Sequence, residues 1–155
     1  MRRGDRAAPA SGRAGGARSG QRPAAPCFDP ARWQACEEYL HGLDLFNHGY
    51  YWECHEALES VWRVAGRRTP AGRLLQGLVQ VAAALWKRQL GAERAARRLA
   101  ERGAAKLGAA PEALLGLAPR RLAREVEAWL AGGPPPVLRL AARDTAGLAR
   151  IQSSV

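Results

Sequence analysis

A histidine and three glutamates share residues 46–62, which read F-N-H-G-Y-Y-W-E-C-H-E-A-L-E-S-V-W. His55 and Glu59 are four residues apart, so on a helix their side chains are within reach of one another. Glu56 lies at the edge of the same helix face, whereas Glu53 points roughly the other way. His55, Glu56 and Glu59 are therefore the candidate chemical centre, and any catalytic role would belong to them.

Three kinds of chemistry fit these residues. In the first, Glu59 accepts a hydrogen bond from His55, and the pair fastens the helix to its neighbours as satisfied polar networks do. In the second, His55 with Glu59 or Glu56 coordinates a divalent metal ion, because imidazole and carboxylate groups one turn apart can share a cation. In the third, a carboxylate and His55 perform acid–base chemistry in a cleft, since histidine titrates near neutral pH.

The remaining histidines and cysteines add no ligand set. The zinc-protease pattern H-E-x-x-H is not met, because Glu59 stands in place of its second histidine. His41 and His48 lie near the end of the preceding helix, where we expect them to be exposed. Three cysteines without a C-x-x-C pair make neither a disulfide framework nor a zinc ribbon, which favours the cytoplasm. Cys54 is expected to be a small buried residue.

The helix that carries these groups has one broad aromatic face. At 100° per residue this face is made of Tyr51, Trp52, His55, Leu58, Glu59 and Trp62. Because it is the more apolar side, we expect it to face the core. Glu53, Ala57 and Ser60 fall on roughly the opposite side.

Capping residues, prolines and glycines divide the chain into helices. Asp29-Pro30 and Thr69-Pro70 each combine an N-cap residue with proline in the first turn, and Gly49, Gly66 and Gly91 each end a helix. The expected helices span about residues 30–47, 50–65, 70–90, 92–107 and 119–130. No alternating strand pattern is present. Together with the short connections, this predicts an all-α fold, a compact bundle of about four to five helices.

Composition changes mark three regions. Residues 1–26 are rich in Arg, Gly, Ala and Pro without apolar periodicity, and are expected to be a disordered extension. Residues 27–133 form the helical bundle domain. Residues 134–155 begin with three prolines, which must be extended, and we expect this tail to pack only near 137–140. No run of about 18 apolar residues exists, so no membrane-spanning helix is predicted.

The net charge of +10 raises the question of nucleic acid. Residues 1–26 hold six arginines against one aspartate, so half of the excess lies in that extension. No aromatic side chains interleave with these charges to stack on bases. A weak, non-specific affinity for polyanions is expected, and a basic nucleic-acid-associated protein is the second alternative for function.

The helix expected at residues 70–90 carries polar side chains that could hydrogen-bond to the candidate chemical centre. Gln76 and Gln80 share a polar stripe, from which they are candidates to hydrogen-bond to Glu56 or Glu59; a solvated seam explains them equally well. Gly77 is small enough to let another helix backbone come close. This helix is apolar over most of its surface, which is typical of the central helix of a bundle.

Two ordered motifs carry a family resemblance. The chain reads G-Y-Y-W-E-C-H-E-A-L-E-S-V-W and then L-L-Q-G-L-V-Q-V-A-A-A-L. Over residues 37–131 it resembles a small all-helical family known only as a domain of unknown function, with a Y-x-E-x-H-E-x-x-E-x-x-W helix followed by Q-G-x-x-x-x-A-A-A-L. The resemblance implies a bundle of four to five helices and no established activity. The signature positions that it implies are Glu53, His55, Glu56, Glu59, Trp62, Gln76 and Gly77.

One departure from the resemblance bears on the metal hypothesis. Members of the family often place a histidine after A-A-A-L, where this chain has Trp86 and Lys87. If that histidine were a second metal ligand, this chain would lack it. We therefore predict a structural or binding module of unknown ligand. The alternative is a metal-assisted or acid–base hydrolase that uses His55, Glu56 and Glu59. Exposed aromatic side chains would also allow a homo-oligomer.

Overall fold

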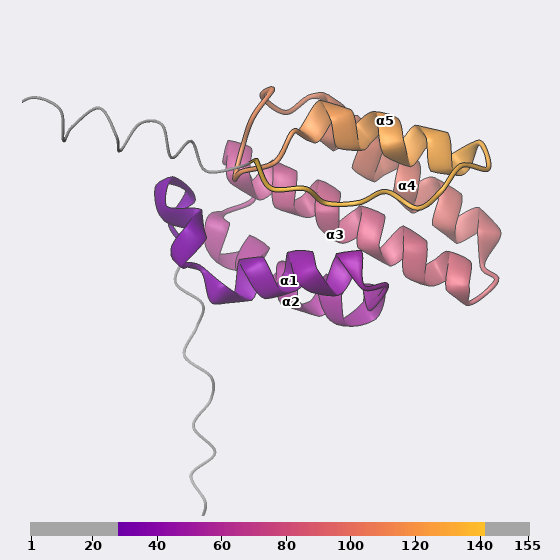
Figure 1. The fold of residues 1–155 in the computed structure, drawn as a ribbon, viewed down its shortest axis with the longest axis horizontal. Helices are drawn as coiled ribbons and strands as arrows, with labels where there is room; N and C mark the ends of the chain where they lie inside the picture. The colour runs from indigo at the N-terminus through magenta and orange to yellow at the C-terminus, as the bar shows by residue number, and fades with distance from the viewer. Residues whose placement is uncertain (1–27, 142–155) are drawn as a thin grey trace, which may run out of the picture.

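Six helices follow one another along residues 28–141, the part of the chain that the computed structural model describes (Figure 1). Those residues contain no strand, and the predicted all-α bundle is confirmed. The expectations for residues 1–26 and for the end of the tail lie outside the described residues. The helices are η1 (Pro30–Ala35), α1 (Glu37–Asn47), α2 (Tyr51–Ala65), α3 (Pro70–Gln89), α4 (Glu93–Gly108) and α5 (Pro119–Leu130).

The predicted N-caps at Asp29 and Thr69 are present in the structure. The carboxylate of Asp29 accepts a hydrogen bond from the backbone N–H of Ala31 at 2.9 Å. Thr69 Oγ1 accepts one from the N–H of Gly72, also at 2.9 Å, and so opens α3. Gly66, behind α2, has a φ of +85°, a backbone conformation that glycine adopts without a steric penalty. Local chemistry therefore sets these three helix ends.

The single helix expected over residues 30–47 is wrong, because the chain breaks into η1 and α1 at Cys36. Cys36 is extended, with φ −88° and ψ 95°. Trp33 packs edge-on against Tyr39 at 6.1 Å between ring centroids. These two residues are six apart, so one continuous helix would turn their side chains to different faces. The break lets both rings meet at the edge of the core.

The long helix α3 lies at the centre of the bundle. It packs against α2 on one side and α4 on the other, while α1 covers α2 and α5 covers α4. Figure 1 shows this order, with α3 running between the α1–α2 hairpin and the α4–α5 pair. Eleven of its residues are buried, which agrees with its predicted central position. Helix α3 is therefore the scaffold to which both halves of the molecule attach.

Two glycines bring the backbones of α3 and α4 together. A Cβ atom on Gly103 would lie 2.7 Å from Val81 Cγ2 and 2.9 Å from the carbonyl oxygen of Gly77. A Cβ on Gly77 would lie 3.2 Å from the side chain of Leu107. The close approach expected at Gly77 is therefore present, and Gly103 is its partner on α4.

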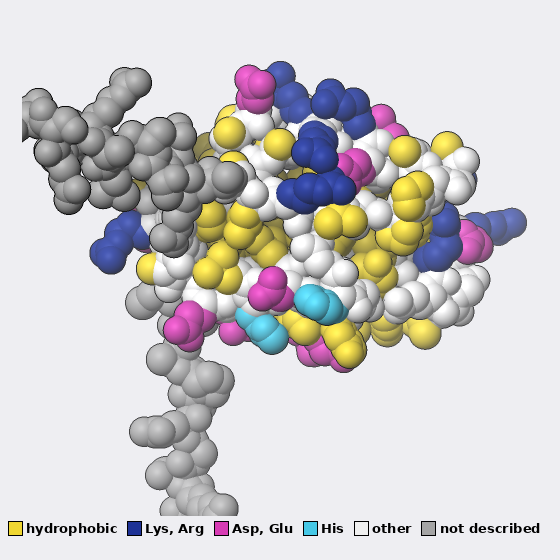
Figure 2. Space-filling model, in the orientation of Figure 1, with side chains coloured by type: hydrophobic (Ala, Val, Ile, Leu, Met, Phe, Trp, Pro, Cys, Tyr) yellow, Lys and Arg dark blue, Asp and Glu magenta, His cyan; other side chains and the backbone are white. Residues whose placement is uncertain are grey.

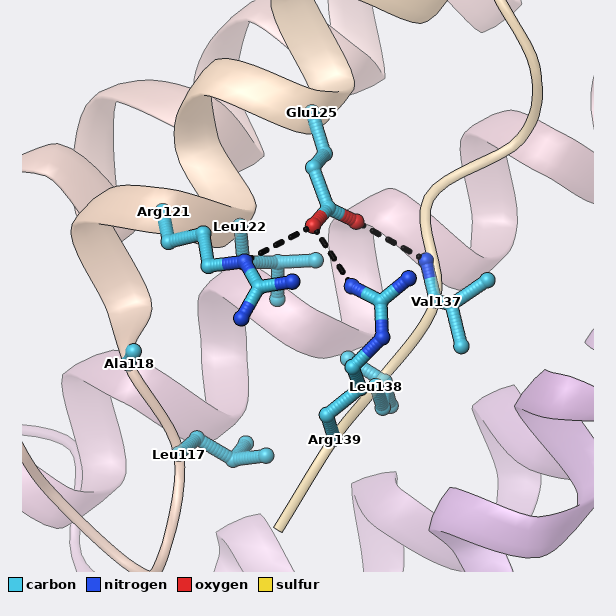
Figure 3. Close-up of a pocket in the computed structure, with 8 residues that line it drawn as sticks. All are labelled: Leu117, Ala118, Arg121, Leu122, Glu125, Val137, Leu138 and Arg139. Atoms are coloured by element: carbon cyan, nitrogen blue, oxygen red, sulfur yellow. Dashed lines mark hydrogen bonds and ion pairs between the residues drawn. The ribbon is translucent and has the colours of Figure 1, made fainter. Parts of the chain in front are cut away.

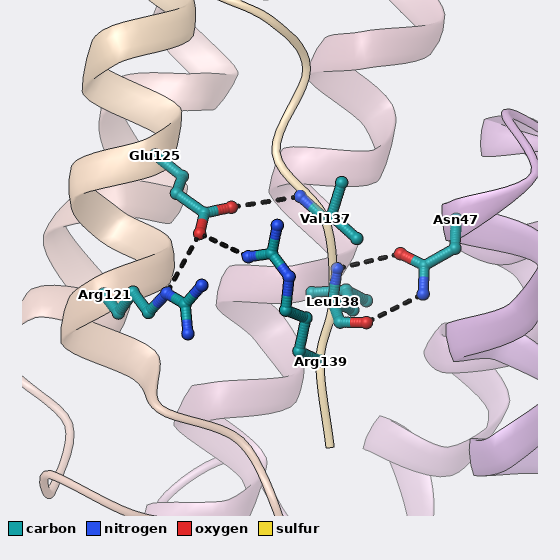
Figure 4. A network of polar contacts seen from close by, with 6 residues as sticks. All are labelled: Asn47, Arg121, Glu125, Val137, Leu138 and Arg139. Carbon is teal, nitrogen blue, oxygen red and sulfur yellow. Dashed lines mark hydrogen bonds and ion pairs between the residues drawn. The ribbon is translucent and has the colours of Figure 1, made fainter. Parts of the chain in front are cut away.

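After α5 the chain returns across the bundle as an extended strap, residues 133–141 (Figure 1). Leu138 is buried, at 5% exposure, so the tail packs where the sequence predicted. The side chain of Asn47 donates to the carbonyl oxygen of Leu138 at 2.7 Å and accepts from its N–H at 2.8 Å. Figure 4 shows this clamp beside a second one, in which the carboxylate of Glu125 accepts a hydrogen bond from the N–H of Val137. The strap thereby connects α5 to α1.

None of the helices in the described part of the chain is both long enough and apolar enough to cross a bilayer.

Candidate functional site

Helix α2 is rotated relative to the sequence-based expectation. Its buried residues are Cys54, Ala57, Leu58 and Val61, which follow i, i+3, i+4, i+7 spacing. Of the predicted aromatic face only Leu58 is buried. The reason lies on α1, where Gly42 leaves room for Leu58: a Cβ on that glycine would lie 2.6 Å from Leu58 Cδ2. The small and aliphatic side chains therefore fill the core, and the larger aromatic ones lie at its edge.

His55 belongs to a stack of rings at this edge. Its imidazole lies parallel to the indole of Trp52, with 5.4 Å between centroids and 9° between planes. Trp52 in turn packs at 4.5 Å against Trp86 of α3, the residue that stands where the family resemblance implies a histidine. His55 Nδ1 is buried and has no hydrogen-bond partner among the described residues. The imidazole of His55 thus packs against the Trp52 indole and fixes its orientation.

The glutamates are placed apart from this stack. The carboxylate of Glu59 accepts a hydrogen bond from Arg63 of the same helix at 3.1 Å. This ion pair replaces the expected hydrogen bond from His55, whose ring is turned onto Trp52 instead. Glu53 and Glu56 are exposed. His55 lies four residues before Glu59 and Arg63 four residues after it. The spacing therefore allows Glu59 to pair with either residue.

No group of three or more His, Cys, Asp or Glu side chains that could hold a metal ion occurs within residues 28–141. A cation at His55 and Glu59 would therefore have at most two protein ligands of these types among the described residues. Metal binding by His55 and Glu59, and catalysis by His55, Glu56 and Glu59, stay predictions. His41 and His48 are exposed, as expected, and His48 Nδ1 lies 2.7 Å from the carbonyl oxygen of Asp44.

One of the supporting residues on α3, Gln80, turns toward α4 instead of α2. Gln80 Oε1 accepts a hydrogen bond from Lys106 Nζ of α4 at 3.1 Å, so the expected bond to Glu56 or Glu59 is wrong for this residue. Gln76 is half-buried. On α2, Trp62 is half-buried with its indole N–H unpartnered among the described residues, and the guanidinium of Arg67 lies 5.3 Å from its ring centroid.

Cys54 is fully buried, and burial raises the pKa of its thiol to about 12. A thiol is nucleophilic only as the thiolate. Cys54 is therefore protonated at neutral pH and fills space in the core, as the sequence predicted.

The aromatic stack borders a hollow at one end of the bundle, which we call the aromatic cleft. Its volume is about 390 Å³. It is lined by Gly49, Tyr50, Tyr51, Trp52, Glu53, Trp86 and Gln89. Tyr50 is 57% exposed and Trp52 is 40% exposed, which is unusual for such large rings. Gln89 Nε2 donates to the carbonyl oxygen of Gly49 at 3.4 Å and joins the two sides of the cleft.

A smaller hollow lies under the strap, with a volume of about 30 Å³ (Figure 3). Its polar centre is the carboxylate of Glu125, which contacts the guanidinium groups of Arg121 at 3.2 Å and Arg139 at 2.9 Å. This volume is about a tenth of the lower limit for small-molecule sites, roughly 300 Å³. This network therefore holds the strap in place and leaves no room for a larger ligand.

Residues 39–99 match the model of a family described as a domain of unknown function (DUF309). The matched segment contains most of α1, all of α2 and α3, and the first part of α4. It therefore includes His55 and the whole aromatic cleft. The DUF309 match leaves the individual signature positions untested. The search of curated proteins found no match.

Sequence reasoning missed two residues that shape the cleft, Tyr50 and Trp86. A signal existed for Trp86, because it is the one aromatic residue of α3, and so large a ring gains most by packing against another element. Tyr50 precedes α2 in the turn after α1, where helical periodicity gives no orientation. Its exposure follows from the turn and from the position of Gln89 across the cleft.

Proposed function

We propose that this protein is a binding module and that the aromatic cleft of its DUF309 segment takes a cationic group. The observation that carries the proposal is the cleft itself, with four aromatic side chains and one charged residue, Glu53, among its lining. Aromatic rings attract cations through the negative potential of their faces, and a nearby carboxylate adds to this attraction. The matching ligand is an alkylammonium or guanidinium group on a small molecule or on a partner peptide.

The charge distribution supports the same reading. Residues 28–66, which form η1, α1 and α2, hold seven acidic and two basic side chains. The space-filling view shows acidic and histidine side chains over α1, whereas lysine and arginine side chains gather over α5 (Figure 2). Although the whole chain is basic, the segment that supplies Gly49 to Glu53 to the cleft is acidic, whereas Trp86 and Gln89 come from the basic helix α3. On the α1–α2 side of the cleft an approaching cation therefore meets a favourable local field.

The protein itself contains a cation–π contact at the edge of the cleft, between Lys87 and Trp86. The ammonium group of Lys87 lies 4.6 Å from the centroid of the Trp86 ring. That distance is within the range in which a cation and an aromatic face attract one another. The ammonium group of Lys87 thus already lies on Trp86, and Trp52 packs between His55 and Trp86, so the most open ring of the cleft is Tyr50, with the exposed part of Trp52 beside it. His55 acts as a positioning residue, because its ring supports the indole of Trp52.

As part of this proposal we place the module in the cytoplasm, which is supported by the free thiols of Cys36 and Cys54. A binding role also accounts for the exposed aromatic side chains better than a purely structural one. Tryptophan and tyrosine are enriched among the residues that dominate binding energies.

Calorimetric titration of the full-length protein with N-acetyl-arginine amide tests the proposal. A cation–π contact contributes about 0.5–2 kcal/mol, so Trp52→Leu should weaken binding by roughly 2- to 30-fold. Glu53→Gln should weaken it by a similar factor, because it removes the carboxylate but keeps the shape of the side chain. Glu112→Gln is the matched control, since Glu112 is also exposed but does not line the cleft. Equal effects of the two glutamine substitutions would contradict the proposal.

A further inference from the structure

A second cleft opens along the seam between α3 and α4, on the opposite side of α3 from the acidic α1–α2 hairpin. Its volume is about 480 Å³, within the range of small-molecule sites. Three of its lining side chains are cationic, namely Arg73 at the start of α3 and Arg102 and Lys106 on α4. The other five lining residues are all alanine or proline. We call this hollow the basic cleft.

The basic cleft exists because of how the two helices meet. Their backbones come together at Gly77 and Gly103. Beyond that contact, toward Pro70, the seam is lined by Ala105 of α4 and by Ala109, directly after this helix, whose side chains are too short to close it. The floor is therefore apolar, and only the long cationic side chains reach around the opening.

No carboxylate offsets these charges within the cleft, because none is among its lining residues. In the part of the chain that the structure describes, Arg73 and Arg102 take part in no ion pair. Lys106 is half-buried, and its ammonium group donates to Gln80 Oε1, a neutral partner that fixes its position without cancelling its charge. Three like charges around one hollow repel one another, and an anion would relieve that repulsion.

The surroundings strengthen the positive potential. Residues 67–141, which contain α3, α4 and α5, carry fourteen basic and five acidic side chains. An excess of one sign around a cleft with apolar walls concentrates ligands of the opposite sign. The charge is thus divided between an acidic segment, residues 28–66, and a basic one, residues 67–141, and every residue that lines the basic cleft belongs to the basic segment.

We propose that the basic cleft binds a small phosphate monoester that carries an apolar group. Two guanidinium groups and one ammonium group match a dianionic phosphate, because arginine presents paired N–H donors to two phosphate oxygens. The alanine and proline floor is suited to an aliphatic or aromatic body next to the phosphate. A nucleic-acid strand fits less well, since no aromatic side chain lines the cleft to stack on a base.

Titration of the full-length protein with phenyl phosphate, inorganic phosphate and benzyl alcohol tests both parts of this inference. Phenyl phosphate should bind about tenfold or more tightly than inorganic phosphate, because burying its ring adds apolar contact. Benzyl alcohol should bind more weakly than either anion. If inorganic phosphate and phenyl phosphate bound equally, the apolar part of the inference would be overturned.

Substitutions on α4 locate the site. Arg102→Gln should weaken phenyl phosphate binding by about tenfold. Arg98→Gln is the matched control on the same helix, exposed and outside the cleft, and should change binding by less than about twofold. Ala105→Glu adds a carboxylate at an exposed lining position and should also weaken binding. Equal losses from the two arginine variants would show diffuse charge attraction and overturn the site.

Competition separates a small ligand from a nucleic acid. A single-stranded oligonucleotide should displace phenyl phosphate only weakly, and that displacement should fall as salt is added. If the oligonucleotide displaced half of the bound phenyl phosphate at a concentration below the one at which phenyl phosphate half-saturates the protein, the small-ligand assignment would be wrong. These outcomes are independent of the aromatic cleft, because Glu53→Gln should leave phenyl phosphate binding unchanged.

Discussion

The contact between α3 and α4 gives the sharpest prediction about the scaffold. In Gly103→Ala the new Cβ atom would lie 2.7 Å from Val81 Cγ2 and 2.9 Å from the carbonyl oxygen of Gly77. The second neighbour is a backbone atom, so no side-chain rotation can move it away. The two helices must therefore separate locally, in a bundle whose central helix is α3.

The magnitude follows from two opposing effects. Overpacking a well-filled interior costs about 1–3 kcal/mol, and a contact with backbone belongs in the upper part of that range. Replacing glycine by alanine inside a helix stabilises it by about 1 kcal/mol. We therefore expect Gly103→Ala to lower the free energy of unfolding by about 1–2 kcal/mol.

Gly108→Ala on the same helix is the matched control. A Cβ atom on Gly108 would have no neighbour within 4 Å, so only the conformational effect acts. We expect it to raise the free energy of unfolding by about 0.4–1 kcal/mol. Urea unfolding followed by circular dichroism measures both variants on one scale. A Gly103→Ala protein as stable as Gly108→Ala would refute the close approach of the two helices.

Three further predictions concern the core and the strap. His55→Phe keeps the ring that supports Trp52 and removes the unpartnered Nδ1 atom, so the free energy of unfolding should rise by about 1 kcal/mol in urea titrations. Asn47→Ala removes both hydrogen bonds to Leu138, so the free energy of unfolding should fall by about 1–3 kcal/mol and proteolysis of the strap should become faster. Burial raises the pKa of Cys54 to about 12, so the native protein keeps a proton that the unfolded chain releases above about pH 9. Stability should therefore fall as the pH rises from 9 toward 12, by up to about 1.4 kcal/mol per pH unit, and less steeply in Cys54→Ala.

Each of these predictions has a contrary outcome. Destabilisation by His55→Phe would mean that the imidazole Nδ1 makes a hydrogen bond in solution. An Asn47→Ala protein with unchanged stability and unchanged proteolysis would mean that the strap is held without the clamp. Identical pH dependence in the wild type and Cys54→Ala would mean that the thiol is accessible to solvent.

The end of α2 and the start of α3 were predictable because their causes are local. Thr69 caps its own helix three residues ahead, and Gly66 ends the preceding one through its own backbone conformation. The break at Cys36 was not predictable in this way. It depends on the packing of Trp33 against Tyr39, a contact that exists only once the core has formed.

The face of α2 could not be chosen from periodicity, because two overlapping arcs of this helix are both apolar. The space opposite Gly42 on α1 decides that Leu58 and its aliphatic neighbours enter the core. Likewise, residue spacing did not determine the partner of Glu59, because His55 and Arg63 both lie one turn from it. The stack of His55 on Trp52 requires Trp86 from another helix to complete it.

The indole N–H signals of the five tryptophans offer the most direct test of the aromatic cleft as a cation site. We would record ¹H–¹⁵N spectra of the full-length protein during titration with tetramethylammonium chloride, using sodium chloride as the reference. The account predicts that the signals of Trp52 and Trp86 shift with saturation, while those of Trp33 and Trp129 do not move. If no indole signal shifts, or if all of them shift alike, the cleft is not a cation-binding site.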